Sequence, residues 1–167
     1  MIARFARMRE DEKGFTLIEL MVVVLIIGIL IAIALPTFLG ARERAQNRAA
    51  QSSLRIALVA AKTMYTDNDN YATANEAVAT GLPTVEPSLT YNAAGAASTG
   101  PNNVSVAISN VVAGDSQIWA GAAKSDSGKC FWIKDVAVGT PGAGTFFDSG
   151  ATCTGTAALA AAGNKFP

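Results

Sequence analysis

Few residues in this chain carry the side chains that catalysis needs. The 167 residues include no histidine. This excludes Ser-His and Cys-His catalysis, histidine-ligated zinc and the usual acid–base group near neutral pH. The only cysteines, Cys130 and Cys153, have no histidine base to activate a thiol and no other ligands nearby to complete a metal site. We therefore predict no enzymatic activity, no catalytic residue, no metal site and no cofactor.

A disulfide is the better interpretation of Cys130 and Cys153. An even number of cysteines on an exported chain is typical of a disulfide framework. This bond would close a loop across residues 131–152 and contribute about 3 kcal/mol by the chain-entropy argument. The segment 139–167 is rich in glycine and has few large apolar residues. We expect it to depend on the disulfide for its order.

Charge and length limit the class of protein further. Lys and Arg number 13, as do Asp and Glu, so the formal net charge is zero. A balanced chain lacks the basic footprint that binding to nucleic acid requires. A chain of 167 residues is expected to form one globular domain at most, apart from any membrane segment.

One ionisable side chain, Glu19, stands inside a long apolar run. Residues 15–39 contain no other charged residue. As a helix this run would be about 37 Å long, enough to cross a hydrocarbon core of about 30 Å. Three interpretations compete: a simple membrane anchor, a secretory signal cut after Ala34 that releases a binding domain, and a chain cut before the run.

The position of Glu19 favours the cut before the run. A carboxylate at the centre of a bilayer costs about 2.5–3.5 kcal/mol, and no Lys or Arg lies within the run to pair with it. Cleavage after Gly14 would turn Phe15 into a new N-terminus. Its amine would lie one helical turn from Glu19, on the same chain or on a neighbouring subunit. A carboxylate in the first turn also suits the helix dipole.

Residues 13–19 and the apolar run after them resemble the processing site of a known family. They read K-G-F-T-L-I-E and are followed by L-M-V-V-V-L-I-I-G-I-L. This is similar to type IV prepilins and to the related pseudopilins. The resemblance implies that residues 1–14 are a leader cut after Gly14, that Phe15 is N-methylated, and that Glu19 directs subunit docking and neutralises the amine. It also implies a filament-core helix over residues 15–39, a helix-breaking Pro36 and a globular head over residues 40–167.

The same resemblance implies partners and a location. The subunit would be a single-pass protein of the inner membrane and would then polymerise into a helical filament, an extracellular pilus. Its partners would be a prepilin peptidase that also acts as N-methyltransferase, an inner-membrane platform protein and a cytoplasmic assembly ATPase. A pseudopilin of a type II secretion or competence system remains the alternative. The cysteine loop, and the lack of a calcium-type acidic cluster near the C-terminus, favour the pilin.

The expected fold is α+β, with one long N-terminal helix packed on a C-terminal antiparallel sheet. Residues 41–66 change to an amphipathic pattern, and Asp67 to Asn70 are a stop signal. We expect the apolar stripe to pack on the sheet and the basic residues Arg48, Arg55 and Lys62 to face solvent or another subunit. The stripe consists of Leu54, Leu58, Ala61 and Tyr65.

The remaining elements are expected from alternation and turn residues. Residues 71–101 read as a long loop with a short helix at 74–79. Three strands are predicted over residues 104–112, 117–123 and 130–138, joined by turns at Gly114-Asp115 and Ser127-Gly128. Pro36 predicts a kink or local unwinding between Ala32 and Pro36.

Overall fold

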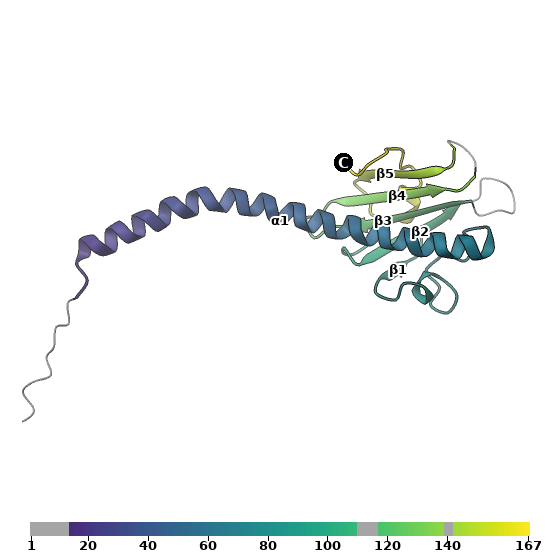
Figure 1. Ribbon diagram of the computed structural model, residues 1–167, viewed down its shortest axis with the longest axis horizontal. Helices are drawn as coiled ribbons and strands as arrows, with labels where there is room; N and C mark the ends of the chain where they lie inside the picture. Colours follow the sequence, from purple (N-terminus) through teal and green to yellow (C-terminus); the bar gives the residue numbers. More distant parts are fainter. Residues whose placement is uncertain (1–13, 110–116, 139–141) are drawn as a thin grey trace, which may run out of the picture. The chain divides into compact units, whose positions relative to one another are not determined.

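The computed structural model describes residues 14–109, 117–138 and 142–167 (Figure 1). The chain forms two compact units that divide between Ala41 and Arg42. Helix α1, Leu17–Asn68, runs from the first unit into the second. The predicted leader residues before Gly14 and the predicted turn at Gly114 and Asp115 lie outside the described residues.

The first half of α1 is apolar on every side. Its large side chains are exposed, from Leu17 at 76% to Leu39 at 53%. The helix continues without a break through Pro36, so the predicted unwinding between Ala32 and Pro36 is wrong, whereas the kink at Pro36 stays a prediction. A proline removes one backbone hydrogen bond, whereas breaking the helix here would require a second nucleation event. The hydroxyl of Thr37 also donates a hydrogen bond of 2.8 Å to the Ala34 carbonyl in this turn.

The second half of α1 forms the base of the head. The predicted stripe is confirmed, because Leu54, Leu58 and Ala61 are buried and Tyr65 is half-buried against the same core. Alanines beside these residues let the helix backbone approach the sheet closely; they are Ala50, Ala57 and Ala60. The helix ends at Asn68, as the stop signal predicted, and Asp69 turns the chain with a φ of 53°.

Five strands form one sheet in the order β1-β2-β3-β4-β5. Their bounds are β1 Thr90–Asn92, β2 Asn103–Ser109, β3 Ile118–Lys124, β4 Cys130–Val136 and β5 Gly144–Gly150. The pairs from β2 to β5 are antiparallel, whereas β1 runs parallel to β2. The three predicted strands therefore correspond to β2, β3 and β4, and the predicted α+β class is confirmed.

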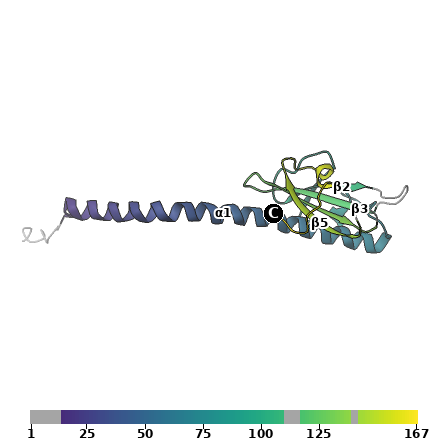
Figure 2. The same cartoon turned by 90° about the horizontal axis from the view of Figure 1, so that it is seen from above.

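The sheet packs against the second half of α1 with alternate residues of each strand (Figure 2). Val104 and Val106 of β2, Trp119 of β3 and Phe131 and Ile133 of β4 all join the core formed with α1. The Trp119 indole is fully buried and donates a hydrogen bond of 3.0 Å to the Ala74 carbonyl. Burial of these side chains fixes the register, because a slip of one residue would turn them to the other face.

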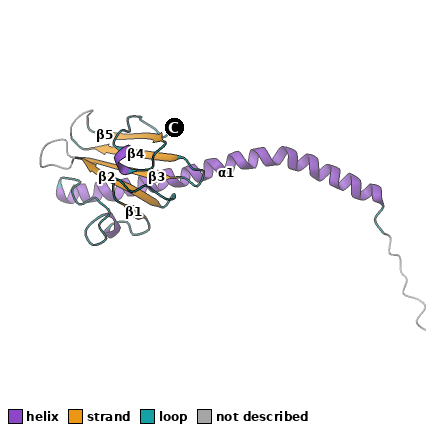
Figure 3. Cartoon of the chain, turned by 180° about the vertical axis from the view of Figure 1, so that it is seen from behind, coloured by secondary structure: helices purple, strands orange, loops and turns teal. Residues whose placement is uncertain are grey.

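The opposite face of the sheet is covered by the short helix α2, Gly155–Ala158, and by Leu159 after it (Figure 3). Ala158 packs on Ala120 and Ala122 of β3. The approach is close enough that a Cβ at Gly155 would overlap the β2 backbone at Val106. Small residues on both sides therefore allow this tight cover.

Two regions differ from the sequence predictions. Residues 74–79 form turns, not a helix, and the loop contains the 3-10 helix η1, Leu82–Thr84, and strand β1. Residues 142–167 contain strand β5 and helix α2, so this segment is not merely held by the disulfide. In β5, Phe147 and Phe146 supply apolar contact, and pairing with β4 supplies the hydrogen bonds that order the glycine-rich chain.

Candidate processing and assembly site

The Gly14–Phe15 peptide bond lies in an exposed segment just before α1. Gly14, Phe15 and Thr16 are outside regular secondary structure, and the helix begins at Leu17. Phe15 is 86% exposed, and a Cβ placed at Gly14 would have no neighbour within 4 Å. An exposed, non-helical bond of this kind can enter a peptidase without unwinding the helix.

Thr16 and Glu19 close the first turn of α1 with reciprocal hydrogen bonds. The Thr16 hydroxyl donates to Glu19 Oε2 at 2.6 Å, and the Thr16 amide donates to the same oxygen at 2.8 Å. The Glu19 amide in turn donates to the Thr16 hydroxyl oxygen at 3.3 Å. This is the capping box of a helix N-terminus, T-x-x-E, in which each side chain satisfies a backbone amide of the other residue.

The capping box gives the Glu19 carboxylate hydrogen-bond partners before any cleavage takes place. The sequence shows that Glu19 has no cationic partner in the apolar run, but its carboxylate is already bound by Thr16 in the uncut chain. Thr16 is the functional residue that the sequence analysis missed, although T-x-x-E before an apolar run is a readable signal for it. The capping box holds the carboxylate at the N-terminal end of α1, within one turn of the Phe15 nitrogen.

Residues 17–39 of α1 present an apolar surface with no protein partner among the described residues. An 18-residue window of α1 near the N-terminus has a mean hydropathy of 3.1, and none of it is buried. By length and composition this helix is able to cross a membrane. A helix that is apolar all round needs either lipid or other helices around it, because water would leave all this surface unburied.

In the head, Cys130 and Cys153 form the predicted disulfide, with their Cα atoms 5.2 Å apart. The bond joins the start of β4 to the chain that follows β5. Trp132 lies beside it and donates a hydrogen bond of 2.9 Å from Nε1 to the Thr152 carbonyl. The disulfide therefore fixes the start of the C-terminal segment at one end of the sheet.

Two of the three basic residues expected to face solvent or another subunit, Lys62 and Arg55, are exposed as expected but also make contacts within the head. Lys62 forms an ion pair of 2.8 Å with the buried Asp135, which also accepts hydrogen bonds of 2.6 Å from Tyr71 and Thr145. Burial, and then the hydrogen bond to Asp135, raise the pKa of Tyr71 above its ordinary range. Three donors surround one carboxylate, so this cluster joins α1 to β4 and β5 and leaves no free acid for chemistry.

Arg55, the second of these basic residues, lies over the ring of Phe166, 4.9 Å from its centroid. Phe166 packs in turn edge-on against Phe131 and Phe147. This contact ties the end of the C-terminal segment to α1.

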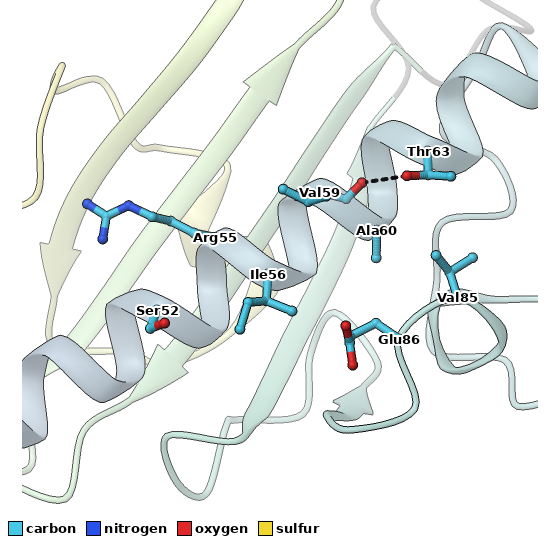
Figure 4. Close-up of a pocket in the computed structure, with 8 residues that line it drawn as sticks. All are labelled: Ser52, Arg55, Ile56, Val59, Ala60, Thr63, Val85 and Glu86. Atoms are coloured by element: carbon cyan, nitrogen blue, oxygen red, sulfur yellow. Dashed lines mark hydrogen bonds between the residues drawn. The ribbon is translucent and has the colours of Figure 1, made fainter.

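A shallow groove of about 410 Å³ runs beside α1 in the head (Figure 4). Figure 4 shows Ile56, Val59 and Ala60 on the helix and Val85 and Glu86 on the loop across from it. Val59 is 65% exposed and Val85 is 42% exposed. Most of the surface of the groove is apolar, although Ser52, Arg55, Thr63 and Glu86 also line it, so its chemistry suits packing.

The part of the chain that the structure describes contains no group of three or more Asp, Glu or Cys residues placed to hold a metal ion. Its two ion pairs are Lys62–Asp135 and Lys129–Glu43. The hydrogen bond from Lys129, at 2.9 Å, holds the pKa of Glu43 below its usual range. Lys62, Asp135, Lys129 and Glu43 thus act in structural pairs.

The N-terminal segment is similar to a known protein family. The family described as the prokaryotic N-terminal methylation motif matches residues 10–35. The chain is 43% identical, over 69 residues, to the type IV major pilin protein PilA of Myxococcus xanthus, covering 41% of this chain and 31% of that protein. It is 38% identical, over 93 residues, to the type II secretion system core protein G of Escherichia coli, covering 53% and 63%.

A third relative is the type IV wide pilus major component PilA4 of Thermus thermophilus, with 37% identity over 84 residues that cover 49% of this chain and 63% of that protein. The chain thus spans between 31% and 63% of the lengths of these three relatives. No solved structure matches the chain at a significant level.

Proposed function

Since the methylation motif and these relatives support the type IV pilin and pseudopilin family for this chain, we propose that it is a structural subunit of a type IV pilus. The single observation that carries the proposal is an exposed Gly14–Phe15 bond directly before a capped helix whose first half is apolar apart from Glu19. The relatives are structural proteins and not enzymes by their names, which agrees with the absence of histidine in this sequence.

Processing is the first step of the proposed function. A prepilin peptidase hydrolyses the amide bond between Gly14 and Phe15, which releases the leader and leaves a free amine on Phe15. The same enzyme then methylates this nitrogen. The match of the methylation motif to residues 10–35 supports this step, because the motif includes both residues and Glu19.

Assembly follows through Glu19 and the apolar helix. The capping box keeps the Glu19 carboxylate at the N-terminal end of α1, where a cationic amine from Phe15 of the same or a neighbouring subunit can pair with it. The helix surface of residues 17–39 loses its contact with lipid and gains contact with the same surface of other copies. The filament is thus a homo-oligomer held together at its centre by apolar packing.

We propose that the subunit occupies one location before assembly and another after it. Before assembly α1 holds the chain in the inner membrane as a single span, and after assembly the head lies on the outside of an extracellular pilus. A membrane platform protein and a cytoplasmic ATPase supply the extraction step, since the chain has no phosphate-binding loop of the GxxxxGK[ST] type.

A pseudopilin is the second candidate, and one observation favours it. The similarity to the type II secretion system core protein G covers 53% of this chain, against 41% for the Myxococcus xanthus pilin and 49% for the Thermus thermophilus pilus component. A pseudopilin would share the processing step and the helix packing. It would differ in forming a short filament within a secretion system.

Mass spectrometry of the N-terminus of the protein from cells tests the processing step. The proposal requires a mature chain that begins with N-methylated Phe15. A chain that begins at Leu35 would indicate cleavage after Ala34 and a secreted domain, although α1 runs unbroken through that position. Electron microscopy of cells that express the chain then separates a surface pilus from a pseudopilus.

A further inference from the structure

The segment of α1 that follows the apolar run carries three arginines without partners. Arg42, Arg44 and Arg48 are exposed, and no described acidic side chain forms an ion pair with them. The only acid in this stretch of α1, Glu43, is bound to Lys129 of the β3–β4 turn. This part of the head therefore carries a net positive charge that nothing described in the protein neutralises.

The three arginines point to more than one side of the helix. Arg44 and Arg48 are four residues apart and share a side, whereas Arg42 is two residues before Arg44 and lies on roughly the opposite side. We call these three residues the arginine collar. A flat protein partner would meet only one side of α1, whereas a surface that surrounds the helix can meet all three.

The spacing along α1 puts the arginine collar at the depth of lipid headgroups. If residues 17–39 occupy the hydrocarbon core, they span about 35 Å of helix against a core of about 30 Å. Arg42 and Arg44 then lie about 5–8 Å beyond Leu39, within the headgroup layer. Arg48 lies about 14 Å beyond it, and its long side chain can reach back toward that layer.

Charge is also segregated along the head. Between Lys62 and Lys124 the chain has no Lys or Arg, and all of its charged residues there are acidic. Two of these acids, Asp67 and Asp69, stand at the far end of α1, about 28 Å along the helix from Arg48. That distance exceeds the Debye length of about 8–10 Å at physiological salt, so these acids do not cancel the arginine collar.

We propose that the arginine collar binds the phosphate groups of anionic phospholipids. This binding would hold the head at the membrane surface before the subunit assembles. The proposal rests on the membrane-held stage of the proposed function. Arginine is suited to this role because its guanidinium group binds phosphate through two parallel hydrogen bonds. The arginines would release the lipid phosphates on assembly, when the helix leaves the bilayer.

The test uses the full chain in phosphatidylcholine bilayers with a trace of spin-labelled phosphatidylglycerol or spin-labelled phosphatidylcholine. Electron paramagnetic resonance reports how strongly each lipid associates with the protein. Since one basic residue near an anionic surface contributes about 1 kcal/mol, or about fivefold in association, the variant R42Q/R44Q/R48Q is expected to lower the preference for phosphatidylglycerol at least fivefold. The leader is present in both chains, so its basic residues do not affect the comparison.

Two further variants serve as a control and as a test with the opposite expected effect. Arg55→Gln is the matched control, because Arg55 lies on the same helix about 20 Å beyond Arg42 and should leave the preference unchanged. Glu43→Gln removes the acid that stands between Arg42 and Arg44 in the sequence and frees Lys129, so it should raise the preference. An unchanged preference in R42Q/R44Q/R48Q, or an equal loss in Arg55→Gln, would overturn the proposal.

Alkaline extraction of the same samples separates the two proposals. A chain that resists extraction but shows no preference for phosphatidylglycerol overturns the lipid-binding role alone. A chain that alkali releases has not inserted, which overturns both this role and the membrane stage of the proposed function. If the triple variant instead abolishes chemical cross-linking between copies without any change in lipid preference, the arginine collar is a contact between subunits, and the lipid proposal is wrong.

Discussion

One carboxylate oxygen of Glu19 accepts hydrogen bonds from both the hydroxyl and the amide of Thr16, at 2.6 and 2.8 Å. Glu19 therefore serves two purposes in the proposed function. In the uncut chain it caps α1 through Thr16, and in the mature chain it meets the Phe15 amine. Both purposes need the carboxylate at the same end of the helix, and T-x-x-E spacing places it there.

Loss of the Thr16 hydroxyl should loosen the first turn of α1. In Thr16→Ala, the Glu19 amide loses its acceptor and Glu19 Oε2 loses its shortest hydrogen bond. We expect hydrogen exchange of the first-turn amides to become roughly fivefold faster, as the loss of an N-cap of ordinary strength would give. Thr16→Ser keeps the hydroxyl and is the control. Equal exchange rates in all three chains would show that the capping box does not stabilise the turn.

Two substitutions of Glu19 separate its charge from its hydrogen bonds. Glu19→Ala should insert into membranes as well as the parent chain, or better, because it removes a carboxylate from an apolar segment. It should fail to assemble into filaments. Glu19→Gln keeps an acceptor oxygen for Thr16 but cannot form an ion pair. Filament yield from cells and membrane extraction are the measurements, and normal filament yield from Glu19→Gln would contradict the pairing role.

Replacement of Gly14 should stop processing without any effect on the fold. The chain around Gly14 is open, so a larger residue meets no clash in the protein itself. We expect Gly14→Leu to accumulate as a membrane-held precursor, larger than the mature chain by the 14-residue leader, because the peptidase site must then accept a bulky side chain. Intact-mass measurement of the membrane fraction decides this. A normally processed Gly14→Leu chain would show that cleavage does not depend on this glycine.

The disulfide should matter for the stability of the head more than for its architecture. In Cys130→Ser/Cys153→Ser, loss of the cross-link should lower the free energy of unfolding by about 3 kcal/mol, since the unfolded chain gains freedom over the closed loop. Strand β5 and helix α2 should still form, because pairing with β4 and packing on Ala120 and Ala122 do not involve the sulfur atoms.

Chemical denaturation of the double variant, with circular dichroism as the probe, measures this change. The reduced parent chain is the control and should match the variant. A variant that loses its sheet signal altogether would support the sequence-based expectation that the C-terminal segment depends on the disulfide for its order.

The long elements of this protein were predictable because their patterns are strong over many residues. The apolar run is recognised by its length and its lack of charged residues other than Glu19, and the stripe at Leu54, Leu58 and Ala61 by the period of a helix, which burial confirms. The sequences of strands β2 to β4 are recognised by a rough alternation of apolar and polar residues with a period of two, and by turn residues between them. Such patterns depend on the residues themselves and need no knowledge of the partner segment.

The short elements were not predictable for the opposite reason. Strand β1 has three residues and exists because it pairs with β2, and Asn103 binds both Thr90 and Asn92 through its side chain. Strand β5 is rich in glycine and gains its order from pairing with β4. The ion pair between the half-exposed Lys62 and the buried Asp135 joins residues that are far apart in the sequence. In each case the decisive contact is between distant residues, so local pattern carries no signal for it.

The free energy of unfolding of the head should depend on pH through Lys134, a lysine buried on β4. Its ammonium group donates a hydrogen bond of 3.0 Å to the Leu159 carbonyl and lies 5.2 Å from the centroid of Phe146. Burial removes this cation from water and so lowers the pKa of Lys134 below its ordinary value of 10.5. The folded protein therefore holds this proton more weakly than the unfolded chain does.

The sign of the effect follows from linkage. Because the unfolded chain binds more protons between the folded and unfolded pKa values of Lys134, stability rises with pH in that window and falls as pH decreases through the folded value. In Lys134→Met this dependence is absent. From about pH 8 to about pH 10, the free energy of unfolding of the parent chain should therefore rise relative to that of Lys134→Met.

The comparison should stop near pH 10, because the raised pKa values of Tyr71 and Tyr91 have the opposite effect above it. These tyrosines ionise first in the unfolded chain, so stability is lost at higher pH in both proteins. Urea denaturation across the pH series measures the difference between the two chains. A difference that does not change with pH would mean that Lys134 keeps its ordinary affinity for the proton, and that its hydrogen bond to Leu159 fully replaces the water lost on burial.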